Sequence, residues 1–117
     1  MTAAFLAAAI LLAAPVAIDG DTLRDGAVIY RLENIDAPES IRGAKCPEEA
    51  ALADQATREA WRLLLSAKRV EARPSGRIDK YNRVIARIFL DGEDLGEALI
   101  AKGLAKPWRG RHAKWCE

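Results

Sequence analysis

Histidine and cysteine are scarce in this chain, and their scarcity narrows the chemistry that the sequence can support. The 117 residues include one histidine, His112, and two cysteines, Cys46 and Cys116. Because a structural zinc site takes four clustered Cys or His ligands, two cysteines without neighbouring histidines predict no site of that kind. The isolated His112 is expected to be a surface residue.

The interpretation of the two cysteines depends on the compartment in which the protein resides. In an oxidising compartment, a Cys46–Cys116 disulfide would tie the C-terminal tail to the body of the protein. It would stabilise the fold mainly by restricting the unfolded chain, by about 4 kcal/mol for so long a loop. In the cytosol, both residues are expected to be free thiols.

Charge is missing from the first 18 residues, MTAAFLAAAILLAAPVAI. This run is too short and too rich in alanine to be assigned as a membrane span, and it lacks the basic leader of a secretory signal. Three interpretations of residues 1–17 are open: a signal peptide, an uncleaved membrane anchor, or the first strand of the domain. Export to a secreted or periplasmic location is favoured, with residues 18–117 as the folded domain.

The remaining charges are divided unevenly along a chain whose length suits one domain. The net charge is only +1, yet residues 1–67 hold six Lys or Arg against ten Asp or Glu, and residues 68–117 hold twelve against seven. An acidic first half and a basic second half can form a cleft that holds a cation beside a phosphate chain. They can also form two solvated faces of opposite sign.

Hydrophobic periodicity and turn signals predict a small barrel. The Asp25-Gly26 pair marks a hairpin between two strand-like segments. The expected strands are 22–24, 27–33, 68–74 and 83–90, and the expected helices are 47–67 and 93–103, the second ending at Gly103. With a first strand from the N-terminus, this order predicts an α+β, mainly β fold: a five-stranded OB-fold Greek-key barrel with two packed helices.

Two acidic residues flank the predicted hairpin and indicate a cation site. Asp21 begins one strand and Asp36 follows the next, and antiparallel pairing brings such positions together. Two close carboxylates repel each other unless a positive charge lies between them, and oxygen-only ligands favour Ca²⁺ or Mg²⁺. Taken alone, the Asp-Gly-Asp sequence at 19–21 is also what a simple turn contains.

Further polar residues near these acids fit phosphate chemistry. Glu39 can hold or deprotonate a water molecule beside a cation, or can be a solvent-exposed acid. Arg31 and Arg83 carry guanidinium groups, which bind phosphate bidentately. Lys80 and Tyr81 can hold a terminal phosphate and a base or sugar.

Three motifs together resemble the thermonuclease, or staphylococcal nuclease, family. They are AIDGDTL, YRLENIDAPES and DKYNRVIARIFLDGEDLGEALIAKGLAK, and the resemblance runs from Asp19 to Lys106. It implies a five-stranded OB barrel with packed helices, from which the third helix of the family is absent here. It also implies Ca²⁺ bound by the carboxylates of Asp21 and Asp36 and by the backbone carbonyl of Ala37.

The same resemblance assigns roles to the other polar residues. It makes Glu39 the general base and makes Arg31 and Arg83 the phosphate clamps of the transition state. It matches Lys80 and Tyr81 to residues that hold the far phosphate of the nucleotide. Family members cut DNA and RNA endonucleolytically and leave 3′-phosphate ends.

Two functions are weighed against each other. The first is a calcium-dependent endonuclease, acting as a monomer on single-stranded or flexible regions of DNA and RNA. The alternative is a nucleic-acid-binding OB domain that does not cut. Degenerate, non-cutting repeats of this fold exist, and they typically lack catalytic acids or arginines. The five residues that discriminate between them are all present: Asp21, Arg31, Asp36, Glu39 and Arg83.

Overall fold

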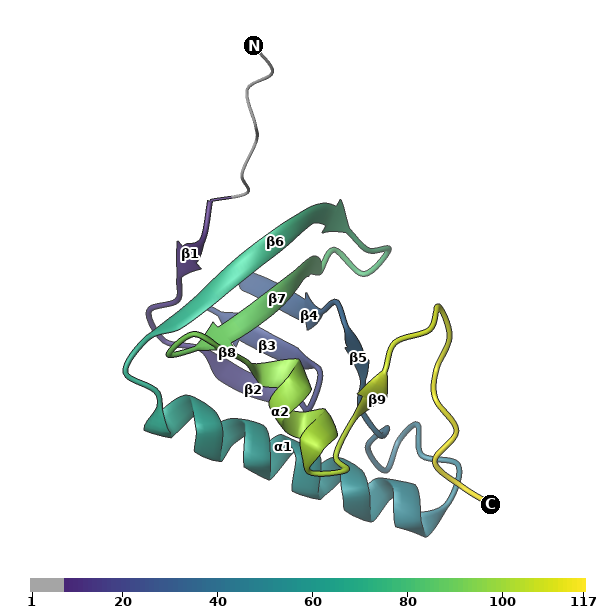
Figure 1. Cartoon of the computed structure of the whole chain (residues 1–117). Helices are drawn as coiled ribbons and strands as arrows, with labels where there is room; N and C mark the ends of the chain where they lie inside the picture. The colour runs from purple at the N-terminus through teal and green to yellow at the C-terminus, as the bar shows by residue number, and fades with distance from the viewer. Residues whose placement is uncertain (1–7) are drawn as a thin grey trace.

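A curled, mostly antiparallel β-sheet is the framework of this computed structural model, which describes residues 8–117 (Figure 1). The strands are β1 (Ile10–Leu11), β2 (Val16–Asp19), β3 (Thr22–Asp25), β4 (Val28–Leu32), β5 (Ile35–Asp36), β6 (Val70–Ile78), β7 (Val84–Leu90), β8 (Glu93–Asp94) and β9 (Lys106–Pro107). The helices are α1 (Pro47–Ser66) and α2 (Leu95–Ala101). The predicted mainly β fold with two helices is confirmed.

The strand order explains how distant segments meet. The large sheet runs β1-β6-β7-β4-β3-β2, with β8 beside β7, and β5 pairs with β9 in a second, two-stranded sheet. Every pairing is antiparallel except that of β4 with β7, which is parallel and places Arg31 opposite Ile85. The longer strands β2, β3, β4, β6 and β7 supply the five predicted by the sequence.

The β3–β4 hairpin forms where the sequence predicts it. Asp25 pairs with Val28 across a two-residue turn, and Gly26 takes a positive φ of 59°. This backbone conformation favours glycine because a Cβ atom is strained there. Beyond the turn, Tyr30 and Leu32 point into the core, as the predicted alternation requires.

Helix α1 lies beneath the sheet and packs against β2 (Figure 1). Its buried apolar positions are Ala53, Ala56, Ala60 and Leu64. The predicted core-facing stripe is confirmed: Ala56 and Ala60 lie in the core, and Leu52, Leu63 and Ala67 are partly buried and pack against it. The β2–β3 turn packs tightly against this face: a Cβ added to Gly20 would lie 2.9 Å from the Cβ of Ala56.

Helix α2 is shorter than the predicted 93–103. The Asp94 carboxylate accepts a hydrogen bond from the backbone N–H of Glu97, at 3.0 Å, and so fixes the start of the helix. Gly103 follows its end with a φ of 71°, in the role that the sequence predicts. Leu95 and Leu99 of α2 are fully buried against the core.

The segment before β2 contributes to the core. Leu12 is 6% exposed and Ala17 is 8% exposed, and β1 pairs with β6 at the sheet edge. Residues 1–7 of the predicted signal, anchor or first strand lie outside the described residues, and whether 1–17 is cleaved stays a prediction. Within residues 8–117, none of the helices is both long and apolar enough to span a membrane.

Leu12→Ala is expected to lower the free energy of unfolding by about 2 kcal/mol or more, because it leaves a cavity under the β1 segment. Urea denaturation followed by circular dichroism measures this change. The matched control is Leu11→Ala, since Leu11 is 61% exposed and should cost far less. Equal losses in the two variants would show that the segment does not pack as described.

Candidate nuclease site

Three charged side chains converge where the ends of β3, β4 and β5 meet. Arg31 Nη2 lies 3.5 Å from Asp21 Oδ2 and 3.5 Å from Asp36 Oδ1. Register explains the approach, because Thr22, directly after Asp21, pairs with Arg31 across the β3–β4 ladder. Both carboxylates are buried, with Asp36 only 1% exposed. The structure therefore brings together the two predicted metal-binding acids and one predicted phosphate clamp.

Backbone groups hold this cluster in place. Arg31 Nη1 donates hydrogen bonds to the carbonyls of Leu32, at 2.6 Å, and Ile35, at 2.8 Å. The buried Ala37 donates its N–H to Asp21 Oδ2 at 2.9 Å. Nη1 of Arg31 thus fixes the β4–β5 connection, while Nη2 points toward the two acids.

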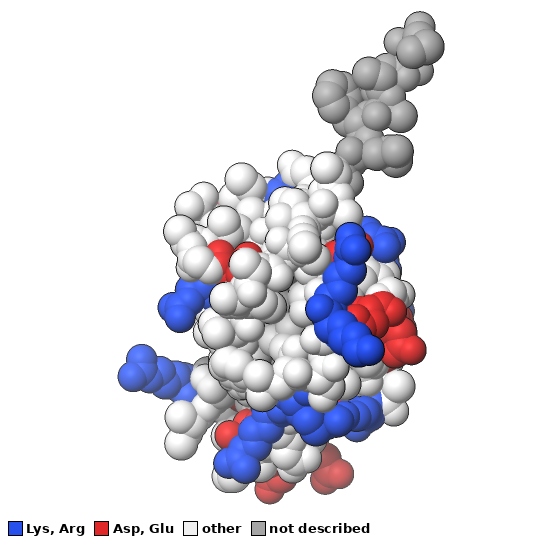
Figure 2. Space-filling view, turned by 90° about the vertical axis from the view of Figure 1, so that its left-hand side faces the viewer, with Lys and Arg blue, Asp and Glu red and all other residues white. Residues whose placement is uncertain are grey.

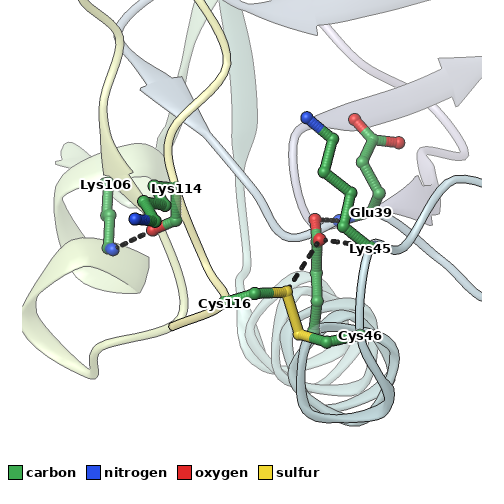
Figure 3. Close-up of a disulfide and its surroundings, with 7 residues drawn as sticks. Glu39, Lys45, Cys46, Lys106, Lys114 and Cys116 are labelled. Carbon is green, nitrogen blue, oxygen red and sulfur yellow. Dashed lines mark hydrogen bonds between the residues drawn. A yellow bond between two sulfur atoms is a disulfide. The ribbon is translucent and has the colours of Figure 1, made fainter.

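Glu39 lies on the rim of the cluster and is positioned by a buried acid. Its backbone N–H donates to Glu49 Oε2 at 2.8 Å, and the N–H of Lys45 donates to Glu49 Oε1 at 3.0 Å. Figure 3 shows the side chains of Glu39 and Lys45 pointing the same way above this anchor. Partial burial and then the negative charge of Asp21 raise the pKa of Glu39 above its ordinary value, while His112 acts to lower it.

Glu49 is a residue whose structural role the sequence did not reveal. It stands in the first turn of α1, where an acid is explained by the helix dipole alone. Burial distinguishes Glu49 from an ordinary acid at the start of a helix. Among residues 8–117, the buried polar residues are Asp21, Thr22, Asp36 and Glu49. Glu49 holds both ends of the loop that presents Glu39.

A disulfide joins the start of α1 to the end of the chain. Cys46 and Cys116 are bonded, with their Cα atoms 6.1 Å apart, which confirms the pairing expected for an oxidising compartment (Figure 3). We call residues 108–117 the C-terminal strap. The strap leaves β9, which pairs with β5, and returns to α1 at this bond, so both of its ends are attached. Figure 1 shows it looping away from β9 and returning to the C-terminus near the start of α1.

The strap carries His112 into the acidic cluster. His112 Nδ1 lies 3.1 Å from Asp36 Oδ1 and 3.8 Å from Glu39 Oε1. The next residue, Ala113, donates its N–H to Asp36 Oδ2 at 2.8 Å. The expected exposure of His112 is correct, at 69% for the side chain, but its contact with the site was not foreseen.

The remaining predicted residues lie on the loop between β6 and β7. Asp79 accepts hydrogen bonds from the N–H of Tyr81, at 2.9 Å, and from Arg83 Nε, at 2.7 Å. The guanidinium of Arg83 and the Nζ of Lys80 each lie 5.2 Å from the centre of the Tyr81 ring. Partial burial of the Asp79 carboxyl acts to raise its pKa. Hydrogen bonds from the backbone and side chain of Arg83 outweigh this and hold the pKa of Asp79 below its ordinary value.

Two adjoining cavities connect this loop with the acids. A cleft of about 870 Å³ is lined by Asp36, Glu39, Arg83 and His112 among others. A smaller cavity of about 280 Å³ includes Arg31, Lys80, Tyr81 and Trp108. Arg83, Tyr81 and His112 line both cavities.

The face seen in Figure 2 differs from this cleft. Its Lys and Arg side chains form separate groups, one on the right and one across the lower part of the view, with uncharged surface between the groups and Asp and Glu beside them. A face of this kind offers no continuous basic path for a phosphate backbone. The arginines Arg31 and Arg83 instead gather at the cavities described above.

Comparison with known proteins identifies the family. A family model described as staphylococcal nuclease homologue matches residues 29–114. The chain belongs to this family, which confirms the resemblance seen in its motifs. Endonuclease YncB of Bacillus subtilis (strain 168) is 33% identical over 98 residues, which cover 77% of this chain and 44% of the relative.

A second relative gives a similar result. The SPbeta prophage-derived endonuclease YokF of the same organism is 33% identical over 95 residues, covering 77% of this chain and 31% of the relative. The chain thus spans less than half the length of these two curated relatives. Both relatives are named as endonucleases.

The donor set at Asp21, Asp36 and Ala37 fits a divalent cation. The two buried carboxylates share one guanidinium nitrogen at 3.5 Å, longer than the roughly 2.7–2.9 Å of a charge-assisted hydrogen bond. One guanidinium therefore faces two carboxylates, which also accept backbone hydrogen bonds from Ala37 and Ala113. Carboxylate and carbonyl oxygens are the ligands that hard cations prefer.

Proposed function

We propose that this protein is a calcium-dependent endonuclease that hydrolyses phosphodiester bonds of DNA and RNA. The observation that carries the proposal is the convergence of Asp21, Arg31 and Asp36 beside a cleft that also contains Glu39 and Arg83. Acids, arginines and a rim carboxylate in one place fit phosphoryl transfer to water. Membership of the staphylococcal nuclease family and the endonuclease descriptions of two relatives support the same reaction.

The proposed metal site uses oxygen ligands only. The carboxylates of Asp21 and Asp36 and the carbonyl of Ala37 would hold Ca²⁺, which would supply a Lewis acid at the phosphate and a point of attachment for water. The N–H of Ala37 donates to Asp21 Oδ2 at 2.9 Å, which holds the backbone of Ala37 beside one of the proposed carboxylate ligands.

Each of the remaining residues has a proposed task in the hydrolysis. Glu39 takes the proton of the attacking water at a carboxylate oxygen. Arg83 and Arg31 bind the non-bridging oxygens of the phosphate, where negative charge increases in the transition state. Arg31 Nη1 is bonded to two carbonyls and Nη2 lies 3.5 Å from both acids, so a phosphate bound by this guanidinium would lie beside the proposed metal ligands. Departure of the 5′-oxygen leaves a 3′-phosphate end.

The proposed substrate is a flexible or single-stranded region of nucleic acid, bound by a monomer. Lys80 and Tyr81 border the smaller cavity and would contact the phosphate and the base or sugar next to the scissile bond. We also propose a secreted or periplasmic location, because a disulfide such as Cys46–Cys116 persists in oxidising compartments.

Incubation with single-stranded DNA tests the proposal. Cleavage is expected with Ca²⁺, and it should stop when EGTA is added and resume when excess Ca²⁺ is restored. Mg²⁺ should support little cleavage, since it requires tighter octahedral geometry and holds its water molecules firmly. Product ends should become extendable by a polymerase only after phosphatase treatment, as 3′-phosphates require.

The outcomes separate the two candidate functions. Full cleavage in EGTA with Mg²⁺ would contradict the calcium requirement while leaving a nuclease. Salt-sensitive binding of single-stranded DNA without cleavage under any of these conditions would favour the non-cutting OB domain.

A further inference from the structure

The cluster of Asp36, Glu39 and His112 brings two carboxylates and an imidazole nitrogen together. His112 Nδ1 faces Asp36 Oδ1 at 3.1 Å and Glu39 Oε1 at 3.8 Å. A neutral imidazole whose Nδ1 carries no proton is an acceptor, and so are both ionised carboxylates. Such atoms repel one another unless a proton or a cation lies between them. Two acids around one nitrogen make a cation the more effective compensation.

We propose that these three side chains form a binding site for a zinc-class transition ion, in addition to the oxygen-only site of the proposed function. The three ligand atoms all lie within 4.8 Å of one another. Tetrahedral zinc with bonds of about 2.0–2.1 Å places its ligands about 3.3 Å apart. The 3.1 Å between His112 Nδ1 and Asp36 Oδ1 is already near this value, and the side chain of Glu39 would move toward the other two. Three protein ligands leave the fourth position to water.

Ligand chemistry separates this ion from calcium. Ca²⁺ is held by oxygen atoms, whereas imidazole nitrogen is a preferred ligand of Zn²⁺, Co²⁺ and Ni²⁺. The imidazole nitrogen of His112 is therefore a metal ligand that favours the zinc-class ions over calcium. Asp36 is shared by the two sets of ligands, so the two ions should compete, and each should lower the apparent affinity of the other to the same extent.

The strap supplies the site with a fixed geometry. The N–H of Ala113 donates to Asp36 Oδ2 at 2.8 Å and orients that carboxylate, as outer hydrogen bonds do in metal sites. The Cys46–Cys116 bond holds the end of the strap against α1, and the β5–β9 pairing holds its beginning. Glu49 fixes the backbone of Glu39 from the same helix. All three ligands are thus anchored from outside the cluster.

Occupation of this site would affect the proposed nuclease directly. The ion would engage Glu39, the proposed base, and Asp36, a proposed calcium ligand. This part of the inference rests on the proposed function, and it predicts that Zn²⁺ inhibits the calcium-supported reaction. The binding itself rests only on the geometry of the three side chains.

The single histidine of the chain makes the test specific. Zn²⁺ is titrated into the oxidised protein, without nucleic acid, calcium, reductant or a polyhistidine tag, while the imidazole resonances are followed by NMR. Because His112 is the only histidine, its signals need no assignment by mutation. They should shift and saturate at one Zn²⁺ per chain, and calorimetry should give the same stoichiometry.

Variants identify the ligands. His112→Ala and Glu39→Gln alter exposed side chains, so both should fold, and each should weaken Zn²⁺ binding by about 10-fold or more, since even outer partners are worth about that much. Arg111→Ala, at a neighbouring exposed position of the strap, is the matched control and should retain binding. Calcium affinity, measured separately, should change far less in His112→Ala than zinc affinity does.

Unmoved imidazole resonances at saturating Zn²⁺, or wild-type zinc affinity in His112→Ala, would overturn the proposed site. Failure of the proposed nuclease function has a different signature, namely normal Zn²⁺ binding in a protein that does not cut DNA with Ca²⁺. The two proposals therefore fail independently.

Discussion

Glu39→Gln is expected to lower kcat on single-stranded DNA by about 10² or more, while leaving the melting temperature almost unchanged. The amide keeps the size and shape of the side chain but cannot accept the proton of the attacking water. Glu39 is exposed, and the contact that positions it is its backbone N–H, which the substitution retains. Steady-state kinetics with Ca²⁺ and a thermal melt measure the two effects.

The matched control is Glu48→Gln, an exposed acid in the first turn of α1. It removes the same charge near the same helix and should leave kcat within a small factor of the wild type. Wild-type turnover in a correctly folded Glu39→Gln protein would show that another group accepts the proton.

Arg31→Lys is expected to reduce both turnover and stability. Lysine keeps the positive charge but loses the planar group that donates at once to two carbonyls and to the acids. We expect kcat to fall by about 10² or more, since the lost donors face the charge that increases in the transition state. Unfolding should become easier by about 2 kcal/mol, because buried acceptors and acids lose a partner.

Urea denaturation and kinetics on the same protein preparation separate the two losses. Arg24→Lys on the neighbouring strand β3 is the control, because Arg24 is exposed. A variant that loses stability but keeps its kcat would mean that Arg31 is a structural residue and does not bind the phosphate. The opposite pattern, with kcat lost and stability retained, would contradict the role of its carbonyl contacts.

The parts of the site that the sequence predicts are those fixed by local pairing. Asp21, Arg31 and Asp36 lie within two short connections of one another, so the Asp25-Gly26 hairpin and alternation are enough to bring them together. Arg83 was placed at the start of a strand, and the parallel β4–β7 pairing then carries that strand to Arg31. The motifs of the family cover these positions.

The parts that the sequence does not predict depend on distant contacts. Asp36 and His112 are 76 positions apart, and their approach follows from the path of the strap between β9 and the disulfide. Strands β5 and β9 have two residues each, too few to show any periodicity. On α1 the predicted stripe faces the core, but Ala53 and Leu64, which are also buried, lie outside it.

The Cys46–Cys116 bond also bears on when the site comes into existence as the chain folds. It closes a loop of 70 positions, and the β4–β7 pairing likewise joins segments far apart in the chain. Contacts of such long range form late, after the entropy of closing the intervening loops has been lost. A chain that is nascent, unfolded or in transit across a membrane would therefore present isolated acids and arginines, and it would acquire the complete cleft only after oxidation and final folding.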